Sequence, residues 1–461
     1  MNREFEEGMG RSVPSLPLGL ASNVVEGNAC RVEWESLITS GAETYLIGNP
    51  PYLGSRRQTK EQKADLEGVL KKDFKSLDYI SAWFFKAGGL LRSGQVTAAT
   101  FVTTNSICQG EQVALLWPRI LIDEVCIEFA YSSFRWTNSA KGNAGVTVAI
   151  VGLRRLGEKS KRLYLQEGVL DCPLISPYLS PGDWKYIRLR SNPLSGFPEM
   201  NFGNMPADGG NLLLSERDKD ALLARNPHLS EYILPFYGAA EFLQGKRRWC
   251  LWMHGYSESA MRAIPELNEI IDQVKEVRSN SSRPKLAQIP HEFAQVTVDV
   301  SQSFLVLPKV SSERRRYVPA GYFSAGNVIS DLCFAVSKAQ PHIHSVLSST
   351  MHMVWLRTVG GRLETRYRYS KDLVYNTFPF PAISKQKEEE LAMCALRILE
   401  VRERYPDRTL AELYDPDKMP EDLLEAHKLN DEAVERSYRA RPFESDEDRL
   451  QVLFDLYTKM T

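Results

Sequence analysis

The chain has 461 residues, which corresponds to roughly two to four domains of ordinary size. Hydrophobic residues make up 43% of the sequence and charged residues 25%, and this composition excludes a disordered or fibrous protein. The formal net charge is −1, which by itself neither indicates nor excludes a nucleic-acid partner.

The amino-terminal sequence and the cysteine pattern indicate where the protein resides and whether disulfides or metals stabilise it. No run of 18 apolar residues occurs, and the first residues, MNREFEEGMGRS, have neither the apolar core nor the cleavage site of a signal peptide. We therefore expect a cytoplasmic protein without a membrane segment. The seven cysteines are scattered, with no CxxC pair and no Cys/His cluster at metal-ligand spacing, so we expect neither a disulfide framework nor a metal site.

Residues 1–155 alternate short apolar runs with helical stretches, which predicts an α/β domain. In chain order, the pattern predicts a strand at 44–48, a helix at 78–92, a strand at 95–104, a helix near 111–122, and strands near 125–131 and 145–153. The last two strands fit an antiparallel pair at the edge of the sheet. Residues 156–200 are rich in Pro, Ser and Gly, so we expect an inter-domain connection there.

The remainder of the chain predicts two more units. Residues 201–381 mix short strands, helices and turns, which favours an α+β domain whose topology the pattern does not define. Residues 382–461 predict a small helical unit, because apolar side chains recur at helical spacing near 388–405, 421–438 and 446–460.

Charge separates along these last two units. Residues 301–380 hold ten Lys and Arg against four Asp and Glu, a net charge of +6, whereas residues 381–461 hold thirteen against twenty, a net charge of −7. Within the basic segment, the runs 314–317 and 362–371 interleave arginines with aromatic residues, as expected for a surface that contacts phosphates and base edges. A solvated charged face is the alternative interpretation of each run.

The most specific motif is Asn49-Pro50-Pro51-Tyr52, which follows the predicted strand at 44–48. It is similar to the (Asn/Asp/Ser)-Pro-Pro-(Tyr/Phe/Trp) motif of methyltransferases that modify exocyclic amino groups, above all that of adenine in DNA. The lone pair of that amino group is conjugated with the ring, so the Asn49 side-chain oxygen and the Pro50 carbonyl would accept its two N–H groups. The prolines stiffen the turn, and Tyr52 offers a ring on which an extruded base can stack.

Segments throughout the chain resemble the MmeI-type, or type IIL, family of restriction-modification proteins. The resemblance rests on segments in the family's order: 25–34, IGNPPYLG at 47–54, Leu77-Asp78-Tyr79, FVTTNSICQ at 101–109, FRWTNSAKGNAGVTV at 134–148, and further segments between 207 and 427. It implies a partial Rossmann-like class I methyltransferase sheet in 1–155, a target recognition domain in 201–381 and a helical unit in 382–461.

The resemblance also implies roles for individual residues. It assigns the flipped base to Asn49, Pro50, Pro51 and Tyr52, with Phe134 and Trp136 lining the base pocket, and it places Asn28 at the cofactor, S-adenosylmethionine. The double-stranded DNA partner is expected at basic residues of the recognition domain: Lys246, Arg247, Arg248, Arg314, Arg315, Arg316, Arg362, Arg366 and Arg368. Plain packing aromatics and solvated charges remain the alternatives for these residues.

Two family features are missing from the sequence. There is no Gly-rich turn after a first strand, spelled like Phe-x-Gly-x-Gly, and no Asp and Glu-x-Lys nuclease site. We therefore expect an incomplete or split chain, with a separate chain supplying the cofactor-binding half and the nuclease. The alternative is a DNA-binding specificity module or inactive remnant without catalysis.

Overall fold

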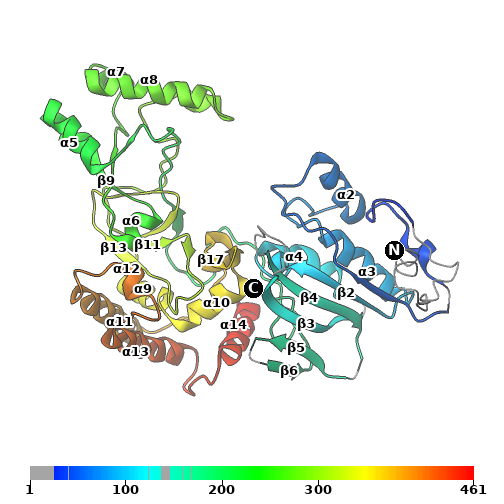
Figure 1. Cartoon of the computed structure of the whole chain (residues 1–461). Coiled ribbons are helices and arrows are strands. Elements are labelled where there is room, and N and C mark those ends of the chain that lie inside the picture. The colour runs from blue at the N-terminus through cyan, green and yellow to red at the C-terminus, as the bar shows by residue number, and fades with distance from the viewer. Residues whose placement is uncertain (1–24, 40, 123, 137–145, 158, 167) are drawn as a thin grey trace, which may run out of the picture.

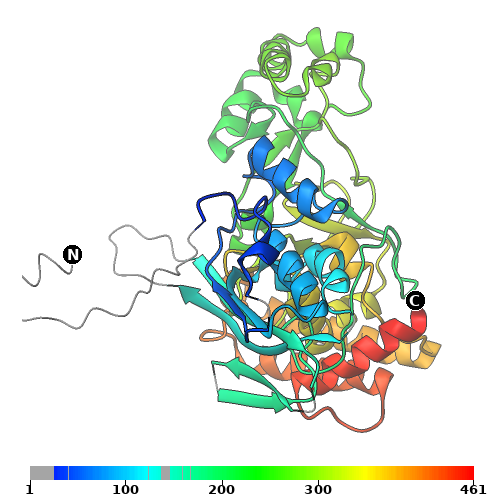
Figure 2. The ribbon, with the colours of Figure 1, turned by 90° about the vertical axis from the view of Figure 1, so that its right-hand side faces the viewer.

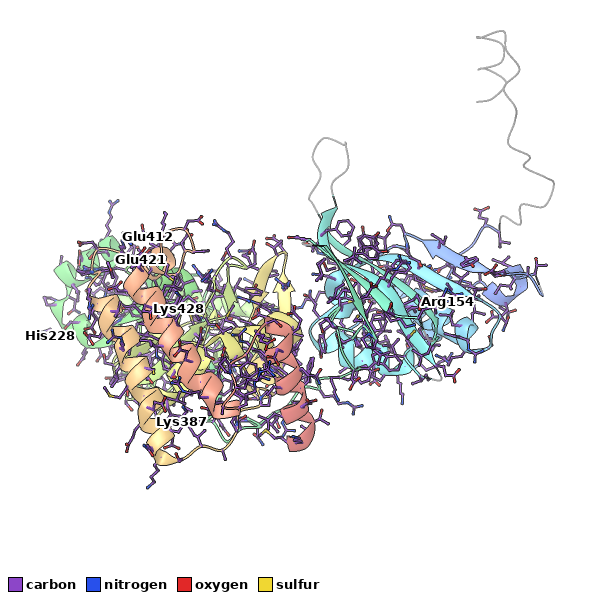
Figure 3. All side chains as sticks on the ribbon, turned by 90° about the horizontal axis from the view of Figure 1, so that it is seen from below. Arg154, His228, Lys387, Glu412, Glu421 and Lys428 are labelled. Carbon is purple, nitrogen blue, oxygen red and sulfur yellow. The ribbon has the colours of Figure 1, made fainter. Side chains whose placement is uncertain are left out.

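The computed structural model describes residues 25–461 except 40, 123, 137–145, 158 and 167. Figure 1 shows two bodies, a first lobe (residues 25–172) and a second lobe (residues 200–461), joined by residues 173–199. Figure 3 shows both from below, with Arg154 on the sheet of the first lobe and Lys387 and Lys428 on helices of the second. No helix in the described part of the chain is long and apolar enough to cross a membrane.

The first lobe is built on one six-stranded sheet with strand order β1-β2-β4-β3-β5-β6. Strands β1, β2, β3 and β5 run parallel to one another, and β4 and β6 run antiparallel to their neighbours. Its elements are β1 (Tyr45–Gly48), α2 (Lys60–Leu70), α3 (Ser81–Arg92), β2 (Ala98–Thr104), α4 (Glu111–Leu116), β3 (Val125–Trp136), β4 (Val146–Arg155), β5 (Lys161–Leu165) and β6 (Gly168–Cys172).

The two faces of this sheet differ. Burial alternates along β2, and the face that carries Ala99 and Phe101 packs on α3, where Phe84 meets Phe101 edge-on. In Figure 2, the helices of the first lobe lie over one side of the sheet. On the opposite face, β1 leaves Ile47 82% exposed and Tyr45 53% exposed. Among the described residues, β1 borders the sheet with an unpaired edge.

The expected connection at 156–200 differs from the structure. Residues 161–172 form β5 and β6, so the antiparallel pair β3–β4 lies inside the sheet rather than at its edge. Residues 173–199 are packed despite their Pro, Ser and Gly content: Tyr178 stacks on Phe454 at 5.9 Å between ring centroids, and Ile187 is fully buried. This segment packs because apolar side chains lie between its Pro, Ser and Gly residues and are buried against the rest of the protein.

The second lobe contains three small sheets, with strand orders β14-β9-β10-β8, β13-β11-β15-β7 and β12-β17-β16. Its strands are β7 (Met200–Phe202), β8 (Leu213–Leu214), β9 (Ile233–Tyr237), β10 (Trp249–Leu251), β11 (Phe304–Pro308), β12 (Val310–Ser311), β13 (Gly321–Phe323), β14 (Val328–Ile329), β15 (Cys333–Ser337), β16 (Gly361–Leu363) and β17 (Arg366–Arg368). Its first helices are α5 (Glu216–Arg225), α6 (Ala239–Gln244), α7 (Glu258–Arg262), α8 (Pro265–Ser279), α9 (Pro341–Leu347) and α10 (Thr350–Val359).

Four helices complete the second lobe: α11 (Lys385–Glu403), α12 (Leu410–Leu413), α13 (Glu421–Tyr438) and α14 (Asp446–Met460). They pack directly on the preceding domain. Asp431 of α13 accepts hydrogen bonds from the Thr350 backbone N–H at 2.6 Å and from the Tyr317 hydroxyl at 2.8 Å, and the Tyr317 ring stacks on His427 at 4.0 Å. The expected helical unit therefore shares a core with the α+β domain.

Three fully buried histidines in this core predict a pH dependence of stability. Burial lowers the pKa of His344, His352 and His427 to about 3, so the folded protein keeps them neutral. Unfolded histidines take up protons below about pH 6.5, so the stability that these residues contribute above that pH is lost as the pH falls toward 3. The expected cost is about 2 kcal/mol per histidine between pH 7 and pH 5.

Urea unfolding at a series of pH values measures this effect. The Asp431 carboxyl offsets part of it, because burial raises its pKa to about 6 and it gains a proton in the same range. His352→Gln should flatten the pH dependence by the share of one histidine, whereas His228→Gln, on the exposed surface (Figure 3), should leave it unchanged. Equal slopes for both variants would contradict the prediction.

Candidate active site and nucleic-acid interface

The Asn49–Tyr52 segment leaves the sheet at the end of β1. The Asn49 side chain is exposed, and no residue that the structure describes forms a hydrogen bond with it or donates to the Pro50 carbonyl. Pro50 is buried and Tyr52 is half-buried against the core of the first lobe. The rigid turn is therefore anchored through its apolar side, while its two oxygen acceptors have no hydrogen-bond donor among the described residues.

The ends of three parallel strands meet at this edge of the sheet. Gly48 lies opposite Phe101, and β2 continues to Thr104. Thr104 and Phe134 both lie opposite Val148, one on each side of β4. The carboxyl ends of parallel strands are where α/β sheets place their ligand sites, so Phe134 and the Asn49–Tyr52 segment lie at the same edge.

The other predicted pocket aromatic is placed only in part. The backbone of Trp136 ends β3 opposite Val146, and Phe134 is half-buried on the same strand. The side chain of Trp136 and the segment 137–145 lie outside the described residues. The role of both aromatics in a base pocket stays a prediction.

Asn28 is held within the protein. Its side-chain nitrogen donates to Asp65 at 2.9 Å, and its side-chain oxygen accepts the backbone N–H of Cys30 at 2.9 Å. Burial alone would raise the pKa of Asp65, but hydrogen bonds from Tyr79, Arg31 and Asn28 lower it. Lys86 of α3 reinforces the turn, donating to the carbonyls of residues 29 and 32. Each polar end of the Asn28 amide thus already has a partner.

The predicted DNA-binding arginines of 314–316 and 362–368 gather on one surface. Strand β12 pairs with β17, β16 pairs with β17, and the Thr365 hydroxyl donates to Glu313 at 2.9 Å, so the two turns lie side by side. We call residues 312–316 and 361–368 the basic hairpin surface. It borders the first lobe, since the backbone N–H of Gly110 donates to the Val359 carbonyl at 3.2 Å.

The cations of the basic hairpin surface are not equivalent. Arg316 and Arg368 are exposed, and neither side chain has an ion pair or hydrogen bond with any described residue. Four others are engaged by neighbours, namely Arg314 with Asp417, Arg315 with Ser311, Arg362 with the Tyr367 ring and the Thr365 carbonyl, and Arg366 with Glu364. Two cations are thus free to contact a phosphate.

Lys246, Arg247 and Arg248 lie elsewhere, in the turn between α6 and β10 on the sheet β14-β9-β10-β8. Arg248 forms an ion pair with Glu241 at 3.2 Å, and Arg247 lies 3.8 Å from Glu216. The structure therefore does not bring these three residues into the basic hairpin surface.

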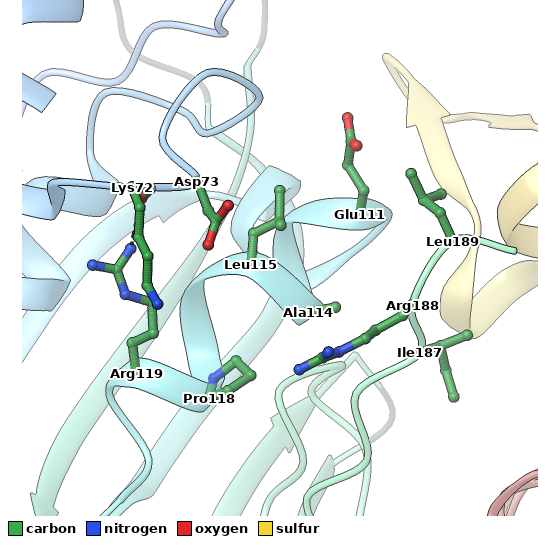
Figure 4. A pocket seen from close by; sticks show the side chains of 10 residues that line it. All are labelled: Lys72, Asp73, Glu111, Ala114, Leu115, Pro118, Arg119, Ile187, Arg188 and Leu189. Carbon is green, nitrogen blue, oxygen red and sulfur yellow. Dashed lines mark hydrogen bonds between the residues drawn. The ribbon is translucent and has the colours of Figure 1, made fainter. Parts of the chain in front are cut away.

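A hollow of about 400 Å³ separates α4 from the connection at 187–189 (Figure 4). Its charged lining is Lys72, Asp73, Glu111, Arg119 and Arg188, of both signs. The Asn49–Tyr52 segment does not line it. Sequence analysis did not identify this hollow. It named Leu77-Asp78-Tyr79 only for its resemblance to the family, not as residues that hold the loop at 49–53, which we call the catalytic-motif loop. No signal in the sequence marks Gln58, which also holds this loop.

Comparison with known proteins identifies the family. Three family models match the chain, namely the DNA-methyltransferase domain of MmeI at residues 1–165, its target recognition domain at 181–382 and its C-terminal domain at 383–461. DNA methyltransferase A of Bacillus subtilis (strain 168) is 41% identical over 470 residues, covering 100% of this chain and 53% of that protein. A solved structure of the type IIL restriction-modification enzyme MmeI in complex with DNA matches with a TM-score of 0.91 at 36% identity, covering 100% of this chain and 63% of that one.

The chain thus spans about half the length of the curated relative. The expected resemblance and the mixed helix and sheet fold class are confirmed. The chain belongs to the MmeI family and carries that family's methyltransferase, target recognition and C-terminal domains in this order.

Proposed function

We propose that this chain carries the catalytic and recognition parts of an adenine-specific DNA methyltransferase in a type IIL restriction-modification system. The observation that carries the proposal is the pair of oxygen acceptors on Asn49 and Pro50, which have no donor among the described residues and lie at the sheet edge where three parallel strands end. Membership of the MmeI family and the similarity to the MmeI–DNA complex support DNA as the substrate.

The chemistry follows from the acceptors. An adenine inside a duplex is unreachable, so the enzyme extrudes the base into the site at the cost of unstacking. The Asn49 side-chain oxygen and the Pro50 carbonyl then accept the two N–H groups of the amino nitrogen, which orients its lone pair. The half-buried Tyr52 ring supports the base from one face. Phe134 and Trp136 are proposed to complete the pocket.

A DNA methyltransferase of this family implies S-adenosylmethionine as the methyl donor. The described residues do not by themselves fit this group, because Asn28 is the one residue assigned to it and its amide also holds Asp65 and the Cys30 backbone. The amide keeps one N–H and one oxygen lone pair that a cofactor could use, but one side chain does not make a site for a molecule of that size. We therefore propose that most of the cofactor site comes from another polypeptide segment.

Among the described residues no strand pairs with the outer edge of β1, which supports a docking place for that segment. Ile47 and Tyr45 are largely exposed on an apolar strand, and unpaired strand edges invite a further strand. The partner that we propose is a separate chain with the cofactor-binding half and the nuclease, which would extend the sheet beside β1. The alternative is that the chain acts as a DNA-binding specificity module without catalysis.

Mapping of N6-methyladenine in host DNA tests the function. Cells that express the chain with its proposed partner should carry methylated adenine at one sequence motif, and the purified complex should transfer a labelled methyl group to that site. If the complex binds a specific DNA site without methylating it, the specificity module is the correct function.

The basic hairpin surface carries a separate prediction. Arg368→Ala should weaken DNA binding and lower the slope of log affinity against log salt by about one unit, because a free cation that contacts a phosphate releases one counterion. Arg314→Ala is the matched control, since Arg314 already pairs with Asp417 and should contribute less. Binding titrations at several salt concentrations measure both slopes. An equal slope for the Arg368→Ala variant and the unsubstituted protein would remove Arg368 from the interface.

A further inference from the structure

The loop after Tyr52 is held by hydrogen bonds to both backbone groups of Leu53. The Leu53 N–H donates to the Asp78 carboxylate at 2.8 Å, and the Leu53 carbonyl accepts from the Tyr79 N–H at 3.0 Å and from the Gln58 side-chain amide at 2.8 Å. Leu53 directly follows the tetrapeptide that carries the two oxygen acceptors. Its position therefore limits where Asn49 and Pro50 can lie.

Asp78 joins this loop to the neighbouring strand and helix. One carboxylate oxygen accepts from the Leu53 N–H and from the Ile80 N–H at 3.3 Å, next to the start of α3. The other oxygen accepts from the Thr104 hydroxyl at 3.4 Å, at the end of β2. One side chain thus ties the catalytic-motif loop to the sheet edge and to α3.

Burying the Asp78 carboxylate costs free energy, which indicates that this carboxylate has a specific role. Asp78 is 2% exposed, and no Lys or Arg of the described residues forms an ion pair with it. Burial raises the pKa of Asp78, while its hydrogen bonds from backbone N–H groups and from Thr104 act against that rise. A buried carboxylate without a cation is expensive and is retained where its acceptors are needed.

We infer that Asp78 is the positioning residue of the proposed methyltransferase site. It fixes Leu53 against the end of β2, so that the Asn49 oxygen and the Pro50 carbonyl converge on one amino group. Asp78 itself lies behind the loop and does not contact the base. The inference rests on the proposed function, because it assigns the loop geometry to the capture of adenine.

Base capture and hydrogen exchange test this role. With 2-aminopurine at the methylated adenine, extrusion of the base raises fluorescence. Asp78→Ala should reduce that rise and the single-turnover rate of methyl transfer at least tenfold at saturating DNA, with the dissociation constant for DNA unchanged within about twofold. Amide exchange of the 49–53 peptide should accelerate in the same variant. Asp78→Asn should recover much of each signal, because its amide oxygen still accepts the Leu53 N–H.

Gln112→Ala is the matched control. The Gln112 side-chain oxygen accepts the Asp78 backbone N–H at 2.9 Å and forms no hydrogen bond with the described residues of the loop, so this variant loses one hydrogen bond in the same region and should keep base capture. A folded Asp78→Ala variant with unchanged base capture and unchanged exchange of the 49–53 peptide overturns the inference. If the unsubstituted complex neither extrudes nor methylates adenine, the proposed function fails. If the 49–53 peptide also exchanges equally slowly in the unsubstituted protein and in the Asp78→Ala variant, the inferred role of Asp78 fails as well.

Discussion

Asn49→Ala is expected to abolish methyl transfer to adenine while DNA affinity stays within about twofold. Loss of one preorganised hydrogen-bond partner at a reacting centre costs about 100- to 1,000-fold in rate. The side chain is exposed and without a partner among the described residues, so its removal leaves the fold intact. Transfer of a labelled methyl group under single-turnover conditions measures the rate, and a binding titration measures the affinity.

Two further variants serve as controls for the Asn49→Ala result. Asn49→Asp keeps an oxygen acceptor at the same position and should retain more activity than the Asn49→Ala variant. Asn280→Ala, at the exposed end of α8, removes an amide far along the chain and should leave transfer unchanged. Full activity of the Asn49→Ala protein would refute the assignment of the catalytic motif.

Arg278→Ala is expected to cause the largest loss of stability. Arg278 is 1% exposed, and its guanidinium donates to five backbone carbonyls, those of Pro206, Ala207, Leu286, Ile289 and Glu292. Substitution leaves these carbonyls without their donor, and the free energy of unfolding should fall by about 4 kcal/mol. The segments near 206 and 290 should then separate from α8.

Chemical denaturation followed by circular dichroism measures the loss. Arg278→Lys should rescue little of it, because an ammonium group has three donors and cannot reproduce the planar arrangement. Arg283→Ala, at an exposed position nearby, should change the free energy of unfolding by less than about 0.5 kcal/mol. A similar decrease in the free energy of unfolding for Arg278→Ala and Arg283→Ala would show that the hydrogen bonds of Arg278 do not stabilise the fold.

Local signals in the sequence were sufficient for much of the fold. The helices expected at 421–438 and 446–460 have these same bounds in the structure, because each has a clear apolar stripe and a clear start. The strand before Asn49 was also predicted, and the motif it presents lies exposed at the sheet edge. The family resemblance rested on the order of several such segments.

What sequence analysis missed depends on contacts between distant residues. The strands β5 and β6 were hidden in a segment whose Pro, Ser and Gly content resembles a linker, and only pairing with β3 makes them part of the sheet. The grouping of the arginines depends on the pairing of β12 with β17, across more than 50 residues of sequence. The hydrogen bond between Asp78 and Leu53 joins residues 25 positions apart, and no periodic pattern in the sequence indicates it.

The contact between α13 and the preceding domain has a practical consequence for chimeric enzymes. Asp431 is bonded to Thr350 and Tyr317, and the ring of Tyr317 rests on His427. A graft that moves the target recognition domain into a homologue with its own tail would leave Thr350 and Tyr317 without the Asp431 carboxylate that accepts their hydrogen bonds. The exchanged segment should instead begin upstream of Tyr178, whose ring stacks on Phe454 of α14, and extend through α14 as one unit.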